Sequence, residues 1–163
     1  MATNKTAQAG QYLTFLLNGQ GYGVPIAAVR EINRLTDITP VPQTPAFVSG
    51  VMNLRGKVIP VIELRLKFGI PKAAHTKQTC IIVIEGEAGQ IGMIVDSVSG
   101  VIDLTLNQIE PAPTMGNEER LSYVLGMGKV DNTVIILVDI IRALGKDEIT
   151  GLINNIKGLN AAA

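Results

Sequence analysis

The sequence predicts a mainly β protein built from two small barrels in tandem, and three observations lead to this fold class. Val and Ile together number 35 against 15 Leu, and β-branched side chains favour a pleated strand over a helix. The chain also contains 17 Gly, 8 Pro and no Trp, a composition typical of many short strands separated by turns. The apolar pattern of the first half then recurs, in the same order, in the second half.

The first copy spans residues 11–70 and is expected to contain about five strands. Gln11–Leu17 alternates between apolar and polar residues and ends at the tight turn Asn18-Gly19. Tyr22–Val29 begins a second stretch whose apolar pattern continues to Leu35. After a Pro-x-Pro connection, the segment from Gly50 to Gly69 predicts a hairpin.

The second copy spans residues 79–145 and repeats these segments. Thr79–Ile84 corresponds to the first strand, and Ile91–Val98 aligns with Tyr22–Val29 at an offset of 69 residues. A second Pro-x-Pro connection follows, and the segment from Gly126 to Gly145 aligns with the earlier hairpin at an offset of 76 residues. Four matching segments in one order indicate an internal duplication.

Each copy has enough strands to close a small barrel that hides its own edges. Residues 71–78 connect the copies, and residues 1–163 are treated as a single domain. Barrels of about 60 residues are marginal alone, so we expect them to share a third apolar core. The sequence leaves open whether strands are exchanged between the barrels.

Helical signals are few. Pro25–Ile32 is compatible with a short turn, and Glu63–Phe68 and Asp139–Leu144 are expected to be short helices that close each barrel. Residues 146–163 form a C-terminal helix and tail in this prediction, with apolar side chains spaced three and four residues apart along Asp147–Ile156. We expect that helix to pack on the barrels; the alternative is a free helix that binds a partner.

The net charge of zero conceals a difference between the halves. Residues 1–78 contain nine Lys/Arg and three Asp/Glu, a net charge of +6, whereas residues 79–163 contain five and eleven, a net charge of −6. One barrel is therefore expected to be basic and the other acidic. Nucleic-acid binding is not expected, because the basic residues are scattered among apolar ones without aromatic interleaving.

The chain lacks the residues that most catalytic and cofactor sites require. His75 is the only histidine and is expected to be a solvated residue of the connection, and Cys80 is expected to be a buried structural thiol. Gly19–Gly23 precedes a strand rather than a helix, so it is not a phosphate loop. We therefore expect no enzyme activity, no cofactor and no metal.

Apolar runs reach only five residues, as in Val134–Val138, whereas a bilayer-spanning helix needs about 20. No secretory signal is visible either. These observations predict a cytoplasmic protein without direct membrane insertion.

Two segments differ between the copies in a way that indicates a contact surface. Arg55, followed by Gly56, takes the place of Asp131 at the hairpin tip, and arginine has no intrinsic merit in a tight turn. The segment Val29–Ile32 carries Arg30 and Glu31 where the second copy has Ser99 and Gly100. We expect Glu31 to hold Arg55 or to compete for it, because both depart from the sister copy.

The run Thr44–Val61, together with Val29–Ile32 and Gln108–Pro113, closely resembles the CheW family of bacterial chemotaxis coupling proteins. The resemblance implies two five-stranded SH3-like barrels and no catalysis. It also implies an adaptor that links the cytoplasmic tips of chemoreceptors to the regulatory domain of the histidine kinase CheA, recruited to membrane-associated receptor arrays.

Four residues matter for coupling in the family and match here: Val29, Glu31, Gly50 and Arg55. Together with the differences between the copies they give the predicted receptor- and kinase-binding set: Val29, Glu31, Ile32, Gly50, Asn53, Arg55, Gly56, Val98 and Val101.

Two other interpretations remain. The chain could be the same module from a larger kinase or from an adaptor fused to a receiver domain, although the initial Met1 and the 163-residue length favour a stand-alone adaptor. A small-ligand-binding barrel fits the fold but lacks convergent polar groups.

Overall fold

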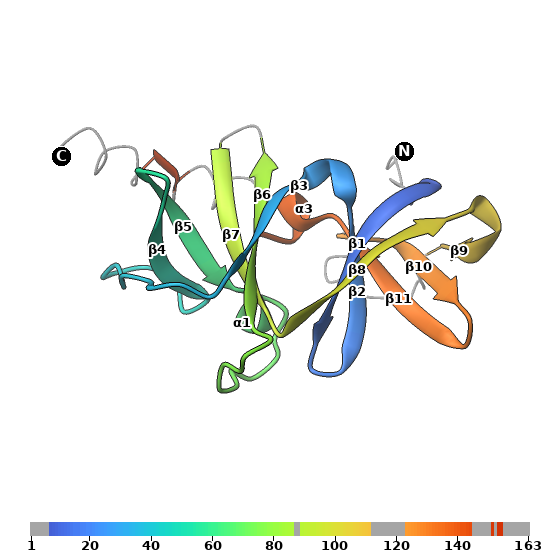
Figure 1. The fold of residues 1–163 in the computed structure, drawn as a ribbon, viewed down its shortest axis with the longest axis horizontal. Coiled ribbons are helices and arrows are strands. Elements are labelled where there is room, and N and C mark those ends of the chain that lie inside the picture. The colour runs from blue at the N-terminus through green and yellow to red at the C-terminus, as the bar shows by residue number, and fades with distance from the viewer. Residues whose placement is uncertain (1–6, 87–88, 112–122, 145–150, 152, 155–163) are drawn as a thin grey trace.

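The computed structural model describes residues 7–86, 89–111, 123–144, 151 and 153–154. Two sheets, with six and five strands, account for most of this part of the chain (Figure 1). The predicted mainly β fold class is confirmed.

The first copy contains the strands β1 (Gly10–Leu17), β2 (Gln20–Pro25), β3 (Val29–Arg34), β4 (Val48–Leu54) and β5 (Lys57–Glu63), the 3₁₀ turn η1 (Ile26–Ala28) and the helix α1 (Leu64–Lys67). The second copy contains β6 (Cys80–Gly86), β7 (Gly89–Val95), β8 (Ser97–Leu104), β9 (Ile109–Glu110), β10 (Val124–Val130) and β11 (Thr133–Val138), with η2 (Leu106–Gln108) and α3 (Ile140–Leu144).

Strands are exchanged between the barrels. One sheet has the order β8-β1-β2-β11-β10-β9 and the other the order β3-β6-β7-β5-β4. The first hairpin of each copy thus completes the barrel of the other copy, and Figure 1 shows blue strands beside orange ones and green strands beside yellow-green ones. The barrels therefore do not coincide with the sequence copies 11–70 and 79–145.

The exchanged hairpins are attached by equivalent parallel pairings. Tyr22 and Gly23 of β2 pair with β11, and β7 pairs with β5 from Gly92, which aligns with Gly23, to Ile94. Each ring then closes through the segment that follows β3 or β8: Thr39 bridges to Val51 of β4, and β9 pairs with β10. If β8 and β9 are counted as one bent strand, each SH3-like barrel has five strands.

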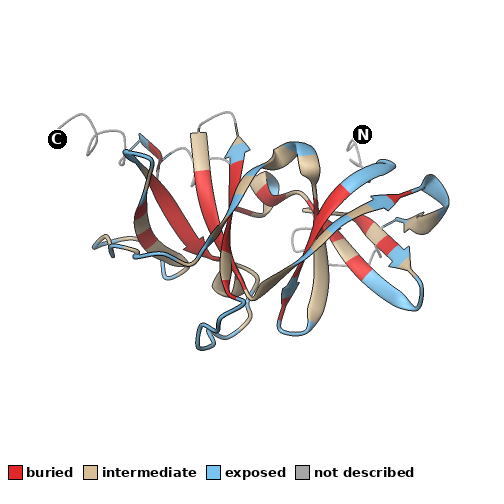
Figure 2. Ribbon diagram, in the orientation of Figure 1, coloured by how far each residue is buried: buried red, intermediate tan, exposed pale blue. Residues whose placement is uncertain are grey.

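Three apolar cores follow from the alternation of side chains along the strands (Figure 2). Each barrel has an interior, represented by Ile81 in one and Leu137 in the other. The third and largest core lies between the barrels and takes Leu13 and Phe15 from β1 and Ile82 from β6. The predicted shared core is confirmed, and it joins the barrels into one packed unit.

The exchange also halves the expected charge difference. Residues 29–95, which supply the described strands of the five-stranded barrel, contain eight Lys/Arg and five Asp/Glu, a net charge of +3. The remainder of the chain carries −3. The prediction of +6 on one barrel and −6 on the other is wrong, because it assumed that each barrel comes from one half of the sequence.

The short helices α1 and α3 lie where the sequence predicts them. Of the C-terminal tail, Gly151, Ile153 and Asn154 are helical, and Ile153 is buried in the shared core. The rest of the predicted tail helix lies outside the described residues.

Candidate partner-binding surface

Arg55 lies at the tip of the β4–β5 hairpin in a two-residue turn. Leu54 pairs with Lys57, while Arg55 and Gly56 have φ angles of 50° and 84°, as the tightest hairpin turns require. The Asn53 side chain accepts the Gly56 N–H at 2.8 Å, which braces the turn. In the other barrel Asp131 occupies the equivalent position with a φ of 54°. The turn therefore projects the guanidinium outward from a defined backbone.

Glu31 of β3 receives this guanidinium in a bidentate ion pair. Nη1 of Arg55 donates to Oε1 at 3.0 Å and Nη2 donates to Oε2, while Asn33 adds a bond of 3.1 Å to Oε1. The hydrogen bond from Arg55 lowers the pKa of the Glu31 carboxyl, and the same contact raises the pKa of Arg55. The expected contact between Glu31 and Arg55 is present, with the arginine side chain 72% exposed.

A β-bulge shapes the strand that carries Glu31. The register between β3 and β6 shifts between Val29 and Glu31, which leaves Arg30 as the extra residue. Arg30 points to solvent and pairs with Glu85 of β6 at 2.9 Å. Ile32, the next residue after Glu31, is 44% exposed. Because side chains alternate along a strand, Ile32 points to the opposite face of β3 from Glu31.

Val29 and Gly50 are enclosed by neighbouring parts of the fold. Val29 packs against the shared core. Gly50 is buried with a φ of 146° at a bulge in β4, and a Cβ atom there would lie 2.1 Å from the carbonyl oxygen of Thr39. Only glycine lets the segment after β3 lie this close to β4. Both residues therefore position the strands that carry Glu31 and Arg55.

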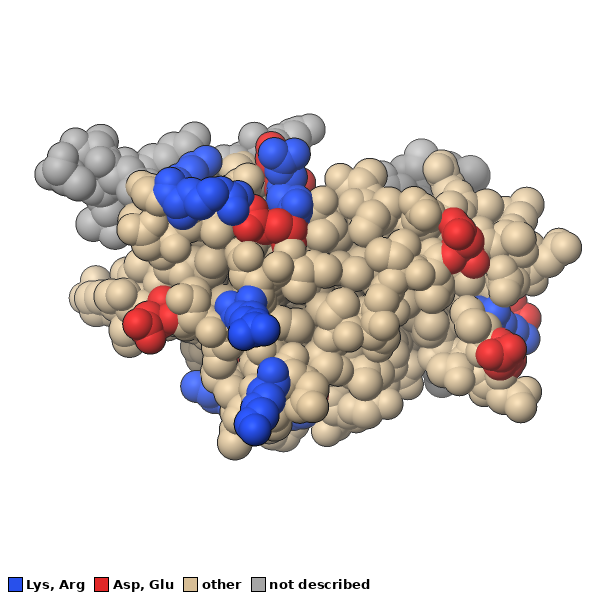
Figure 3. Space-filling model, in the orientation of Figure 1, with Lys and Arg blue, Asp and Glu red and all other residues tan. Residues whose placement is uncertain are grey.

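The structure divides the predicted set between the barrels. Seven of its residues belong to the five-stranded barrel, whereas Val98 and Val101 lie on β8 of the six-stranded barrel. Val98 packs against the shared core and Val101 is 51% exposed. On the face shown in Figure 3, charged side chains lie over the left half and near the right end, and the stretch between them, among the residues drawn there as described, carries none.

Sequence reasoning missed two polar contacts. His75 is not simply solvated, because its Nε2 lies 3.2 Å from Oε2 of the buried Glu63. Arg65 forms a bidentate pair with Asp96, with its Nε 2.7 Å from Oδ1 and its Nη2 2.6 Å from Oδ2. The Arg65–Asp96 pair could have been suspected from the repeat, because the aligned residues in the other copy, Ile141 and Ala27, are uncharged.

Other chemical groups offer little for a reactive site. Cys80 was predicted to be buried but is only partly buried, because it lies at the start of β6. Its partial burial still raises the pKa of the thiol, so the reactive thiolate is disfavoured. Within the described ranges, no three His, Cys, Asp or Glu side chains gather in a way that could hold a metal ion. The helices in this same part of the chain are too short or too polar to cross a bilayer.

Comparison with known proteins gives one consistent match. Residues 11–148 match the family model of the CheW-like domain. The chain is 36% identical over 146 residues to the chemotaxis protein CheW of Klebsiella aerogenes, covering 90% of this chain and 87% of that protein. It is 32% identical to the chemotaxis protein CheW of Rhizobium meliloti, covering 85% and 90%. The crystal structure of the scaffolding protein TtCheW from Thermoanaerobacter tengcongensis superposes with a TM-score of 0.73 at 37% identity, covering 81% of this chain and 90% of that one.

Proposed function

Since the chain belongs to the CheW family of chemotaxis scaffold proteins, we propose that it couples the cytoplasmic tips of chemoreceptors to the histidine kinase CheA. In this role it binds the regulatory domain of the kinase, carries out no reaction of its own and is recruited to receptor arrays. The observation that carries the proposal is the exposed, preorganised Glu31–Arg55 pair on the five-stranded barrel.

The geometry of this pair suits recognition of another protein. The turn fixes the backbone of Arg55, and the carboxylate of Glu31 fixes its guanidinium, so little side-chain freedom remains to be lost on binding. Glu31 accepts two of the five N–H donors of the guanidinium, and those that remain can donate to a carboxylate of a partner. Ile32 is exposed on the opposite face of β3 and is not part of this pair. The charges of such a pair orient a partner and discriminate between partners.

Arg55→Ala tests the proposal, with Asp131→Ala as the matched control at the equivalent turn of the other barrel. We expect Arg55→Ala to weaken binding to the kinase regulatory domain or to a receptor-tip fragment by on the order of 10-fold or more. Receptor-stimulated kinase activity in a reconstituted mixture should fall accordingly. Thermal unfolding should be unchanged, because an exposed tip side chain contributes little packing.

The control decides how the result is interpreted. Unchanged binding and coupling in Arg55→Ala would contradict the proposal, and so would an equal loss in Asp131→Ala. A lowered melting temperature in Arg55→Ala would assign the residue to folding instead.

A charge exchange separates two roles for Glu31. The double variant Glu31→Arg with Arg55→Glu keeps an internal ion pair but reverses both charges. We expect it to remain uncoupled, because the partner interacts with the charges themselves. Full recovery in the double variant would mean that only the internal pair matters.

A further inference from the structure

Asp96 occupies the point where the chain passes from one barrel to the other. It is the single residue between β7 of the five-stranded barrel and β8 of the six-stranded barrel. Its backbone N–H donates to the carbonyl of Leu16 at 3.1 Å, and its Oδ2 accepts the N–H of Asn18 at 2.9 Å. Both partners belong to the β1–β2 hairpin, so Asp96 is fixed to the six-stranded barrel.

Arg65 reaches the same carboxylate from the five-stranded barrel. It lies in α1, directly after β5, and its two bonds to Asp96 measure 2.7 and 2.6 Å. Its remaining nitrogen, Nη1, donates to the carbonyl of Pro71 in the connection at 2.9 Å. The Arg65 side chain is only 13% exposed. This guanidinium therefore ties the five-stranded barrel, the connection and the crossover residue together.

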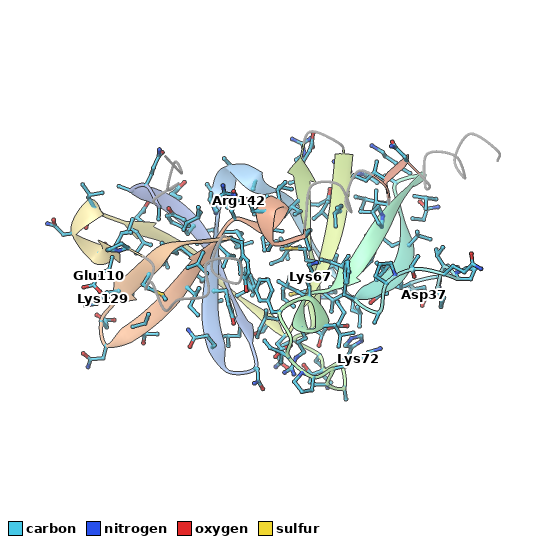
Figure 4. All side chains as sticks on the ribbon, turned by 180° about the vertical axis from the view of Figure 1, so that it is seen from behind. Asp37, Lys67, Lys72, Glu110, Lys129 and Arg142 are labelled. Carbon is cyan, nitrogen blue, oxygen red and sulfur yellow. The ribbon has the colours of Figure 1, made fainter. Side chains whose placement is uncertain are left out.

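Three other carboxylate–arginine or carboxylate–lysine pairs differ in placement. Arg30–Glu85 and Arg55–Glu31 each join elements of the five-stranded barrel, and Lys129–Glu110 joins β10 to β9 in the six-stranded barrel (Figure 4). Their basic side chains are 53% to 72% exposed. Of these four pairs, Arg65–Asp96 has the least exposed basic side chain and lies at the passage between barrels, so water screens it less.

The second crossover lacks such a contact. Ala27 in η1 aligns with Asp96, and Ile141 in α3 aligns with Arg65. Neither side chain can form an ion pair, and Ile141 instead packs on the shared core. The two crossovers, equivalent by the internal repeat, are therefore held by different forces.

We propose that the Arg65–Asp96 pair is a clamp that fixes the angle between the two barrels. The shared core favours close packing of the barrels, but apolar contacts are less directional than a bidentate pair. The clamp also positions the predicted partner residues, because Asp96 lies two residues before Val98 while Glu31 and Arg55 belong to the opposite barrel. This last consequence rests on the proposed function; the clamp itself does not.

Distances between spin labels on the two barrels test the clamp. Lys57→Cys and Thr133→Cys, introduced together with Cys80→Ala, place labels at equivalent exposed positions of the β4–β5 and β10–β11 hairpins. Pulsed electron paramagnetic resonance on the full chain should give one narrow distance distribution. We expect Asp96→Asn and Arg65→Gln to broaden it and displace its mean.

The controls separate the clamp from general loosening and from partner binding. Glu110→Gln breaks a pair within one barrel and should leave the distribution unchanged. The double variant Asp96→Asn with Arg65→Gln should broaden it no more than either single variant, because both act through one contact. Arg55→Ala should weaken partner binding without altering the distribution, so the two proposals can fail separately.

An unchanged distribution in both single variants would overturn the clamp, since the core alone would then set the angle. Equal broadening by Glu110→Gln would overturn it as well. If both clamp variants fail to fold, as judged by circular dichroism, the pair is needed for the fold and not for the angle, and the proposal is wrong.

Discussion

Arg55 is one of four described non-glycine residues with a positive φ, a region that glycine enters without steric cost. We expect Arg55→Gly to leave the melting temperature unchanged or raise it, while coupling is lost as in Arg55→Ala. Arg55 adopts a backbone conformation that is unfavourable for arginine, which indicates that its side chain serves the function rather than the turn. Differential scanning calorimetry together with the kinase assay checks this, with Asp131→Gly as control. A clear loss of stability in Arg55→Gly would contradict it.

Asp96 should make stability depend on acid pH. The hydrogen bond from Arg65 is the main cause of its lowered pKa, with smaller contributions from the Asn18 N–H and from His75. Because the folded pKa lies below the unfolded one, the stabilisation is complete above the ordinary Asp pKa of about 4 and is lost as pH falls through the folded value. Urea unfolding of the wild type and of Asp96→Asn should therefore converge at low pH. A difference that stays constant throughout the acid range would refute this.

Charged residues that differ between the two copies can be recognised in the sequence, whereas the partners they contact mostly cannot. Arg55 and Glu31 were found because both replace unlike residues of the sister copy and lie in the same copy. Arg65 and Asp96 show the same kind of difference but lie in different copies, and they meet only because strands are exchanged. Likewise, nothing local indicates that the connection folds His75 back onto Glu63.

At the scale of elements, the bulge in β4 makes a specific prediction about glycine. Gly50→Ala places a methyl group 2.1 Å from the Thr39 carbonyl oxygen, so the bridge between Thr39 and Val51 must break. We expect a loss of about 3 kcal/mol or more in the free energy of unfolding. Gly56→Ala, also at a positive φ but with open space around it, should cost only about 1–2 kcal/mol. Equal costs in urea unfolding would show that the close approach is unimportant.

Hairpins and short helices were predictable because their signals are local. The turn at Asn18-Gly19 and the helices after the last strand of each copy appear where expected. The bulges at Arg30 and Gly50 were not predicted, since they depend on how a neighbouring strand pairs. The sequence pattern likewise does not distinguish a first hairpin that pairs within its own copy from one that is exchanged, because the same face is buried in both arrangements.

At the scale of the whole molecule, strand exchange means that neither half contains a complete barrel. The fragment 1–78 has β1–β2 from one barrel and β3–β5 from the other, and 79–163 has the complementary strands. We expect each fragment alone to lack the native β spectrum, and an equimolar mixture to regain it, because burial of all three cores requires both halves. Circular dichroism and size-exclusion chromatography check this. A stable monomeric barrel formed by 1–78 alone would contradict it.

The exchanged hairpins also make this single chain equivalent in topology to a symmetric dimer of half-length chains. Two identical chains of half this length, each lending its first hairpin to the other, would have produced the same pair of rings as a symmetric dimer. Fusing their genes places both halves in one polypeptide and frees each to diverge. In a single chain, one half can carry a charged residue that the other lacks, as at Glu31, Arg55 and Asp96. Breaking a twofold symmetry in this way gives a small protein two unlike ends.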